Sequence, residues 1–342
     1  MTAIATTPVP FAAPDVPGAA GLRVAVLVPC YNEAATVTRV VHDFHRALPH
    51  ATVYVYDNAS DDGTTAVARR AGAVVRAEPR RGKGQVVRRM FSDVEADVYL
   101  LVDGDATYDA TAAPAMVRLL LDEHLDMVTG VRDDEGCGGA YRRGHRLGNR
   151  AFNALLGMLF GALPRDLFSG YRAFSRRFVK SFPAASSGFE IETEMTVHAL
   201  EQGLPTAELE TRYFERPAGS VSKLSTCRDG LRILRMTASL FRDQRPLVFF
   251  GAFAALFAAA GLWLGIDVTL EFVQTRLVRR FPTAILATGL MLLAFMLAGC
   301  GLILHHVSGA RRELKRLAYL ALPAPESNPA KAHAPPRAAD VA

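Results

Sequence analysis

Residues 98–105 read VYLLVDGD, an apolar run that ends in two acids. A short apolar run of this kind is typical of a strand buried on both faces of a parallel sheet. Asp103 and Asp105 follow it directly, in an Asp-Gly-Asp turn. An isolated Asp-Gly pair is usually a plain turn, so the meaning of this stretch depends on the rest of the chain.

The segments before and after this stretch alternate between strand-like and helix-like patterns. Apolar residues at helical spacing predict helices over 37–48 and 86–94. Apolar, β-branched runs predict strands at 23–28, 52–57, 73–76, 98–103 and 126–129. Alternation of strands and helices predicts an α/β fold with right-handed βαβ units and a largely parallel sheet.

Three of the predicted strands end in polar, acidic turns. These are PCYNE at 29–33, DNASDDGT at 57–64 and DGD at 103–105. The carboxyl ends of parallel strands meet at one edge of the sheet, where ligands bind. Two carboxylates one residue apart can hold Mg²⁺ or Mn²⁺ and leave positions for phosphate oxygens. We therefore expect Asp103 and Asp105 to form a metal site.

Two long uncharged segments follow, at 247–266 and 283–304. Each forms a helix of ~30 Å, the thickness of a bilayer core, so we expect a transmembrane hairpin rather than two soluble core helices. Arginines before and after the hairpin predict cytoplasmic flanks, although the connecting loop also carries arginines. Gly261 and Gly265 could pack helix on helix or face lipid, which leaves homo-oligomerisation open.

Composition sets the remaining limits. The four cysteines are scattered, which favours a reducing compartment over a zinc site or disulfide framework. The net charge of +5 suits contact with anionic membrane lipids and gives no ground for a nucleic-acid partner. The predicted parts are a disordered tail at 1–21, a catalytic domain at 22–223, an interfacial amphipathic helix at 224–245, a transmembrane hairpin at 246–307, and a basic juxtamembrane segment with a disordered tail at 308–342.

The motifs VPCYNE, DNASDDGT, RRGKGQ and DGD resemble those of the family 2 glycosyltransferases, which have the GT-A fold. The resemblance extends from residue 23 to about residue 235. DLFSGYRAF at 166–174 and AGSVSKL at 218–224 resemble the polyprenyl-phosphate sugar transferases, the dolichol-phosphate mannose synthase group. The pair of C-terminal spans is similar to the bacterial members that act on undecaprenyl phosphate.

The resemblance implies an inverting enzyme of the cytoplasmic (inner) membrane, with its catalytic domain and both termini cytoplasmic. It would move a sugar from a UDP- or GDP-linked donor to a polyprenyl phosphate for cell-envelope glycan synthesis, using Mg²⁺ or Mn²⁺. An anionic lipid phosphate needs no general base, only positioning and cations, for which arginine is well suited.

The resemblance also implies roles for particular residues. Asp103 and Asp105 match the metal and diphosphate motif. Asp105, Arg132 and Arg172 are the expected catalytic residues. The expected substrate-binding residues are Pro29, Tyr31, Glu33, Asp57, Asn58, Lys83, Asp103, Arg146, Asp166, Glu192 and Lys223. Asn58 departs from the family, which often has a second acid at this position.

The alternatives are a processive or hydroxyl-directed polysaccharide synthase and, less favoured, a non-catalytic membrane scaffold, and each disagrees with one feature of the sequence. A processive polysaccharide synthase needs a base and a Gln-Arg-Trp motif, whereas the single tryptophan, Trp263, lies in the first apolar segment. A non-catalytic membrane scaffold conflicts with the intact DGD turn. A dinucleotide-binding dehydrogenase lacks its G-x-G-x-x-G after the first strand, and RRGKGQ lacks the spacing of a P-loop kinase.

Overall fold

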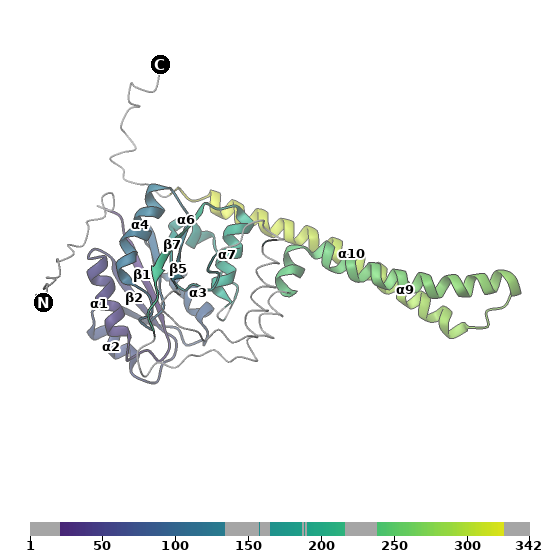
Figure 1. Cartoon of the computed structure of the whole chain (residues 1–342), viewed down its shortest axis with the longest axis horizontal. Helices are drawn as coiled ribbons and strands as arrows, with labels where there is room; N and C mark the ends of the chain where they lie inside the picture. Colours follow the sequence, from purple (N-terminus) through teal and green to yellow (C-terminus); the bar gives the residue numbers. More distant parts are fainter. Residues whose placement is uncertain are drawn as a thin grey trace, which may run out of the picture. The chain divides into compact units, whose positions relative to one another are not determined.

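The computed structural model describes residues 21–133, 157, 165–186, 188, 190–215 and 238–324. The chain forms two compact units. The first comprises 1–139, 164–223 and 315–342, and the second comprises 140–163 and 224–314. The first contains the sheet and its covering helices, and the second contains most of the two long helices α9 and α10 (Figure 1).

The first unit is built on a seven-stranded sheet with the strand order β3-β2-β1-β4-β6-β5-β7. The strands are β1 (Val24–Cys30), β2 (Thr52–Asp57), β3 (Val74–Ala77), β4 (Val98–Leu101), β5 (Met127–Asp133), β6 (Arg172–Ser175) and β7 (Thr206–Arg212). Only β6 is antiparallel to its neighbours, β4 and β5. The prediction of a largely parallel α/β sheet is confirmed.

Helices cover both faces of this sheet (Figure 1). One face carries α1 (Val37–Ala47), α2 (Thr64–Arg70), the short 3₁₀ helix η1 (Ala110–Ala112) and α4 (Ala113–Asp122). The other carries α3 (Lys83–Asp93), α6 (Arg176–Ser181) and α7 (Ile191–Gln202). The predicted apolar stripe of α1 is buried, because residues three and four apart share one side of a helix. Because both faces of the sheet are covered by apolar cores, polar functional side chains are expected at the ends of the strands.

A neutral histidine lies in the second core. His198 of α7 is 2% exposed and packs edge-on against Phe178 and Phe182. Neither of its ring nitrogens has a hydrogen-bond partner among the described residues. Burial, aided by the positive charge of Lys315, lowers the pKa of His198 to about 3. The folded protein therefore keeps this imidazole neutral under conditions in which an unfolded chain would protonate it.

We expect stability to fall as the pH drops below the unfolded histidine pKa of ~6.5, by up to ~1.4 kcal/mol per pH unit from His198. The loss continues toward the folded pKa of about 3. His198→Leu should flatten this part of the profile, measured as the apparent Tm in detergent between pH 8 and 5. His42→Leu, at an exposed position of α1, is the matched control and should keep the wild-type slope. Parallel profiles for wild type and His198→Leu would contradict the assignment.

The end of α10 contributes to the first unit. The hydroxyl of Tyr319 donates to Oδ2 of Asp126 at 2.8 Å, and the guanidinium of Arg177 lies 4.8 Å from the centre of the Tyr319 ring. Lys315 pairs with Glu201 at 2.8 Å. The segment predicted as a basic juxtamembrane region therefore begins as helix, and α10 ends only at Leu320.

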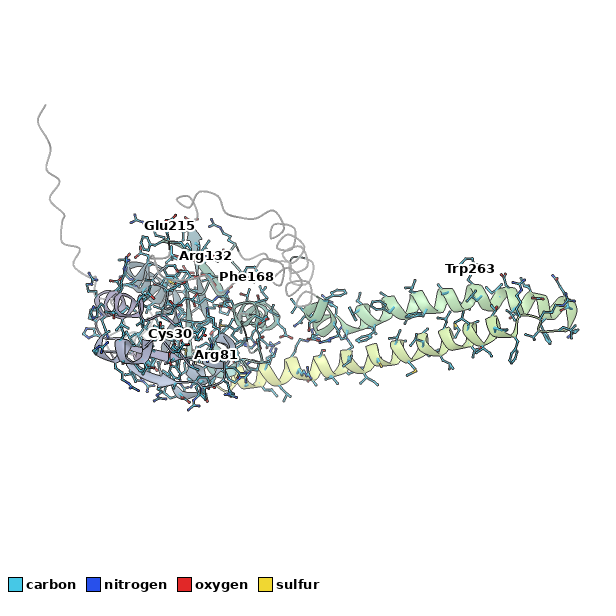
Figure 2. All side chains as sticks on the ribbon, turned by 90° about the horizontal axis from the view of Figure 1, so that it is seen from below. Cys30, Arg81, Arg132, Phe168, Glu215 and Trp263 are labelled. Atoms are coloured by element: carbon cyan, nitrogen blue, oxygen red, sulfur yellow. The ribbon has the colours of Figure 1, made fainter. Side chains whose placement is uncertain are left out.

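The second unit contains α9 (Pro246–Thr275) and most of α10 (Phe281–Leu320), two apolar helices of 30 and 40 residues. Their lengths of ~45 and ~60 Å exceed a bilayer core. Both are long and apolar enough to cross a membrane, with 6% and 17% of their most apolar windows buried. The exposed apolar surface of α9 includes Trp263, which projects from the helix and is 75% exposed (Figure 2). These helices suggest membrane association.

Gly261 acts within this hairpin. A Cβ there would lie 3.1 Å from the carbonyl oxygen of Ala287 and 3.1 Å from Cγ of Met291. The small residue therefore lets α9 and α10 of one chain approach closely, which is one of the two uses expected from its spacing to Gly265.

Candidate active site

The turns after β1 and β2 are tied together by short polar contacts. The amide of Asn32 donates to Oγ of Ser60 at 2.9 Å, and Oδ1 of Asn32 accepts from the amide of Asp61 at 3.0 Å. The amide of Glu33 donates to Oγ1 of Thr64 at 3.0 Å. The parallel register of β1 with β2 brings these two turns to the same sheet edge. The predicted donor-binding turns are therefore neighbours.

Four predicted substrate residues lie at this edge. Pro29 and Tyr31 are partly buried, and the Arg81 guanidinium lies 4.2 Å from the centre of the Tyr31 ring. Glu33 is 8% exposed, and its Oε2 accepts from the Thr36 hydroxyl. Asp57 is 7% exposed, and its Oδ1 has no hydrogen-bond partner among the described residues. A buried acceptor without a partner is costly, so Asp57 is suited to receive a donor group from a ligand.

Asn58 has a different use from the one predicted. Its Nδ2 donates to the carbonyls of Glu78 and Arg80 at 2.9 and 2.7 Å, and its Oδ1 accepts from the Gly82 amide at 2.7 Å. Both amide donors and the oxygen are therefore engaged with the loop before α3. The structure corrects the expectation of direct substrate contact, because Asn58 instead positions the loop that leads into Lys83.

Asn58→Asp should destabilise the protein by ~2–4 kcal/mol, because a carboxylate cannot donate to the two carbonyls and would face them as a buried charge. We expect the apparent Tm to fall by several degrees, with weaker nucleotide binding measured on the same samples. Asn32→Asp is the matched control. The side chain of Asn32 accepts a hydrogen bond from the Asp61 amide through Oδ1, and a carboxylate oxygen can accept the same bond. A stable Asn58→Asp variant would show that the loop does not depend on this amide.

Lys83, Glu192 and Asp103 form one cluster, in which Lys83 and Glu192 are buried and the Asp103 side chain is 29% exposed. The Lys83 ammonium contacts Oδ1 of Asp103 and Oε1 of Glu192, and the side chains of Lys83 and Glu192 are 8% and 6% exposed. Burial opposes the charge of Lys83, but the two carboxylates outweigh it and raise the lysine pKa above its usual value. Oε2 of Glu192 is buried and has no partner among the described residues. Three residues predicted separately are thus brought together.

Asp105 is held by its own turn. Its Oδ1 accepts from the Thr107 amide at 3.3 Å and from the Thr107 hydroxyl at 2.6 Å, and the residue is 4% exposed. Within the described parts of the chain, no three His, Cys, Asp or Glu side chains form a metal cluster. Mg²⁺ is typically held by one or two carboxylates together with phosphate oxygens and water. The oxygen donors of Asp103 and Asp105 fit that pattern, with a donor diphosphate supplying other ligands.

Gly170 and Tyr108 lie near the Asp103 side chain, and neither was predicted as a site residue. A Cβ at Gly170 would lie 2.3 Å from Oδ2 of Asp103. The Gly170 amide donates to the Tyr108 hydroxyl at 2.9 Å. Burial raises the pKa of Tyr108 above its ordinary value, and the negative charge of Asp103 raises it further. The positive charge of Arg132 acts in the opposite direction. The available sequence signal for this contact was the glycine of the SGY motif at 169–171. Glycine, which has no side chain, is typical of positions where the backbone comes close to a site.

Arg132 and Asp166 form a bidentate ion pair. Nε and Nη2 of Arg132 donate to the two Asp166 oxygens at 2.7 and 2.8 Å. The Arg132 side chain is 24% exposed, at the carboxyl end of β5, and its guanidinium lies 5.4 Å from the centre of the Tyr213 ring. Despite burial, the Asp166 hydrogen bonds raise the Arg132 pKa above its ordinary value. The charge is therefore permanent and fixed in direction at the sheet edge.

The predicted catalytic contact of Arg172 is corrected by the structure. This residue is fully buried in β6, and its guanidinium donates to the carbonyls of Leu167 and Ser169 and to the Thr196 hydroxyl. Burial lowers its pKa. Arg172 cannot reach a ligand from this position, and it holds the 166–171 segment that presents Asp166 and Gly170. The other two predicted basic residues, Arg146 and Lys223, lie outside the described residues, as does most of the predicted interfacial helix.

Comparisons with known proteins agree with this architecture. The model of glycosyl transferase family 2 matches residues 25–182. Glycosyltransferase AglJ of Haloferax volcanii is 36% identical over 299 residues, which cover 87% of this chain and 98% of that relative. A dolichyl-phosphate hexose transferase of the same organism is 29% identical over 222 residues, covering 65% of this chain and 95% of the relative.

A solved structure shares the fold. Glucosyl-3-phosphoglycerate synthase of Mycobacterium tuberculosis, crystallised with Mn²⁺, UDP and glucosyl-3-phosphoglycerate, aligns with a TM-score of 0.54 at 22% identity, covering 69% of this chain and 85% of that one. Since the AglJ match extends over nearly the whole of a relative more than one third identical, the chain belongs to glycosyltransferase family 2 and is a glycosyltransferase with a GT-A-like fold.

Proposed function

We propose that this glycosyltransferase moves a sugar from a nucleotide donor to a polyprenyl phosphate at the cytoplasmic membrane face, with inversion at the anomeric carbon. The observation that carries the proposal is that the Asp103 carboxylate, which follows β4, and the fixed guanidinium of Arg132, near the end of β5, lie at the same edge of the sheet. The two apolar helices and the relative named as a dolichyl-phosphate hexose transferase support a lipid acceptor.

On the donor side, the proposed roles follow from hydrogen-bonding capacity. Oδ1 of Asp57, which has no hydrogen-bond partner among the described residues, accepts from the nucleobase, and Glu33 lies in the neighbouring turn at the same sheet edge. Asp103 and Asp105 would hold a divalent metal, Mg²⁺ or Mn²⁺, which would supply Lewis-acid stabilisation of the leaving diphosphate. Lys83 adds a cation at the start of α3. Oε2 of Glu192 accepts from a hydroxyl of the donor sugar.

On the acceptor side, Arg132 orients the lipid phosphate. Asp166 occupies the Nε edge of the guanidinium, and the proposed phosphate contact uses the edge that includes Nη1. An anionic phosphate attacks without losing a proton, so the site needs charge and alignment rather than a base. Arg146 and Lys223 are proposed as further phosphate contacts. The arginine-rich flanks of the apolar helices support the proposed cytoplasmic position of the site.

Transfer to a sugar hydroxyl is the second candidate, and one observation favours it. Glu192 is a buried carboxylate near Asp103, and its burial raises its pKa, as a general base requires. The direct contact with Lys83 argues against this role, because the ammonium stabilises the charged carboxylate and so weakens it as a base.

The acceptor chemistry distinguishes these candidates. Purified full-length protein is incubated with labelled nucleotide sugars and either undecaprenyl phosphate or undecaprenol, and the label entering the organic phase is counted. We expect transfer to the phosphate only, since the alcohol is not an anionic nucleophile at neutral pH. A chelator should stop the reaction, and Mg²⁺ or Mn²⁺ should restore it. Equal transfer to both lipids would contradict a phosphate acceptor and favour a base such as Glu192.

A further inference from the structure

We infer that the Lys83 ammonium is a built-in counter-cation of the metal site, which holds Asp103 until a metal-bound diphosphate displaces it. The inference rests on the metal site proposed above and concerns the order in which that site fills. It follows from the contacts of the Lys83 ammonium with the carboxylates of Asp103 and Glu192.

Both oxygens of the Asp103 carboxylate have a close neighbour. Its Oδ1 contacts the Lys83 ammonium, and the Gly170 backbone lies against its Oδ2. A divalent cation arriving alone must therefore share a carboxylate with an ammonium group already in place. Two positive charges a few ångströms apart repel strongly in a partly buried site, so metal binding without nucleotide is weak.

A nucleoside diphosphate removes this conflict. Its negative charges offer the ammonium a partner in place of Asp103, which frees Oδ1 of Asp103 for the metal. Glu192 gives Lys83 a place to remain, because its Oε1 already contacts the ammonium and its buried Oε2 has no partner among the described residues. A small rotation of the lysine chain keeps the charge paired throughout. Metal and nucleotide therefore bind as a pair, each improving the affinity of the other.

Binding of Mn²⁺, followed by its electron paramagnetic resonance signal, tests the inference on the full-length protein in detergent. Wild type should bind Mn²⁺ at least tenfold more tightly with UDP or GDP than without nucleotide. Lys83→Met should bind Mn²⁺ about tenfold more tightly than wild type without nucleotide, and gain less from UDP or GDP, because the competing charge is gone.

Lys83→Met leaves Glu192 buried and unpaired, so a second variant guards against misfolding. Lys83→Met combined with Glu192→Gln removes one charge of each sign and keeps the net charge. It should still bind Mn²⁺ more tightly than wild type without nucleotide, although it has one carboxylate fewer. Arg89→Met, further along α3 and paired with Asp93, is the matched control and should behave as wild type.

The outcomes distinguish the counter-cation role of Lys83 from the metal site itself. Suppose that wild type shows nucleotide-dependent Mn²⁺ binding, but both lysine variants bind Mn²⁺ no more tightly than wild type. This result would overturn the counter-cation role of Lys83 and leave the metal site in place. An equal gain in Arg89→Met would also overturn it, because the effect would then be general charge. No Mn²⁺ binding by any protein, with or without UDP or GDP, would overturn the metal site as well.

Discussion

Asp105→Asn is expected to lower kcat by ~10³-fold or more while the protein stays folded, because an amide replaces a charged metal ligand. Asparagine keeps an oxygen for the Thr107 amide and hydroxyl, so the turn should survive. Sugar transfer at saturating Mg²⁺ and Mn²⁺ measures the loss, and an unchanged apparent Tm establishes that the fold is intact.

The chain contains its own control for this substitution. Asp109 is followed by Ala and Thr as Asp105 is, and its Oδ1 accepts from the Thr111 amide and hydroxyl at 2.9 and 2.7 Å. Asp109→Asn therefore makes the same chemical change in the same hydrogen-bonding pattern, four positions away. It should retain near wild-type kcat. Comparable losses at both positions, or full activity of Asp105→Asn, would remove Asp105 from the metal site.

Gly170→Ala is expected to lower kcat by ~10²-fold with little change in stability, because the added methyl group must push Asp103 aside. A Cβ at this position would lie 2.3 Å from Oδ2 and 2.9 Å from Cγ of Asp103. Displacement of a reacting group by about 1 Å can cost this much in rate. Transfer kinetics measure the loss, and Mn²⁺ binding in the presence of UDP or GDP should weaken in parallel.

Gly203→Ala serves as the opposite control. Gly203 follows α7 with a φ of +62°, and a Cβ there would have nothing within 4 Å. Alanine at this position costs about 1–2 kcal/mol through backbone strain and should leave kcat unchanged. Stability loss without rate loss at Gly203, and rate loss without stability loss at Gly170, would separate folding from site geometry. Full activity of Gly170→Ala would show that Asp103 need not lie where the structure has it.

The fold was predictable where the hydrophobic pattern had a single meaning. The strands at β1, β2, β3, β4 and β5 and the buried stripe of α1 agree with the structure to within a few residues. In β1 and β4 the signal was an uninterrupted apolar run, which is typical of a strand buried on both faces. β6 and β7 were missed for the opposite reason. β6 carries Arg172 in the middle of the sheet, and β7 is an edge strand of alternating charged residues.

The candidate site was predictable as a set of residue types and less so as a set of contacts. Acidic turns after parallel strands must meet at one edge, which is why Glu33, Asp57 and Asp103 could be grouped from the chain alone. Asn58 and Arg172 could not be assigned correctly, because a polar side chain in a motif looks the same whether it faces a ligand or a backbone carbonyl. Burial and hydrogen-bond partners distinguish the two cases.

The sequence by itself determined the strand–helix alternation, the acidic strand ends and the two apolar helices, all of which depend on local periodicity and residue chemistry. The tertiary structure alone decided that Lys83 lies between Asp103 and Glu192 and that Gly170 lies against Asp103. It also decided that the buried guanidinium of Arg172 bonds to the segment before β6 and to α7. These residues are separated by up to 109 positions, as the interval from Lys83 to Glu192 shows. Contacts across such distances depend on packing, which no local pattern encodes.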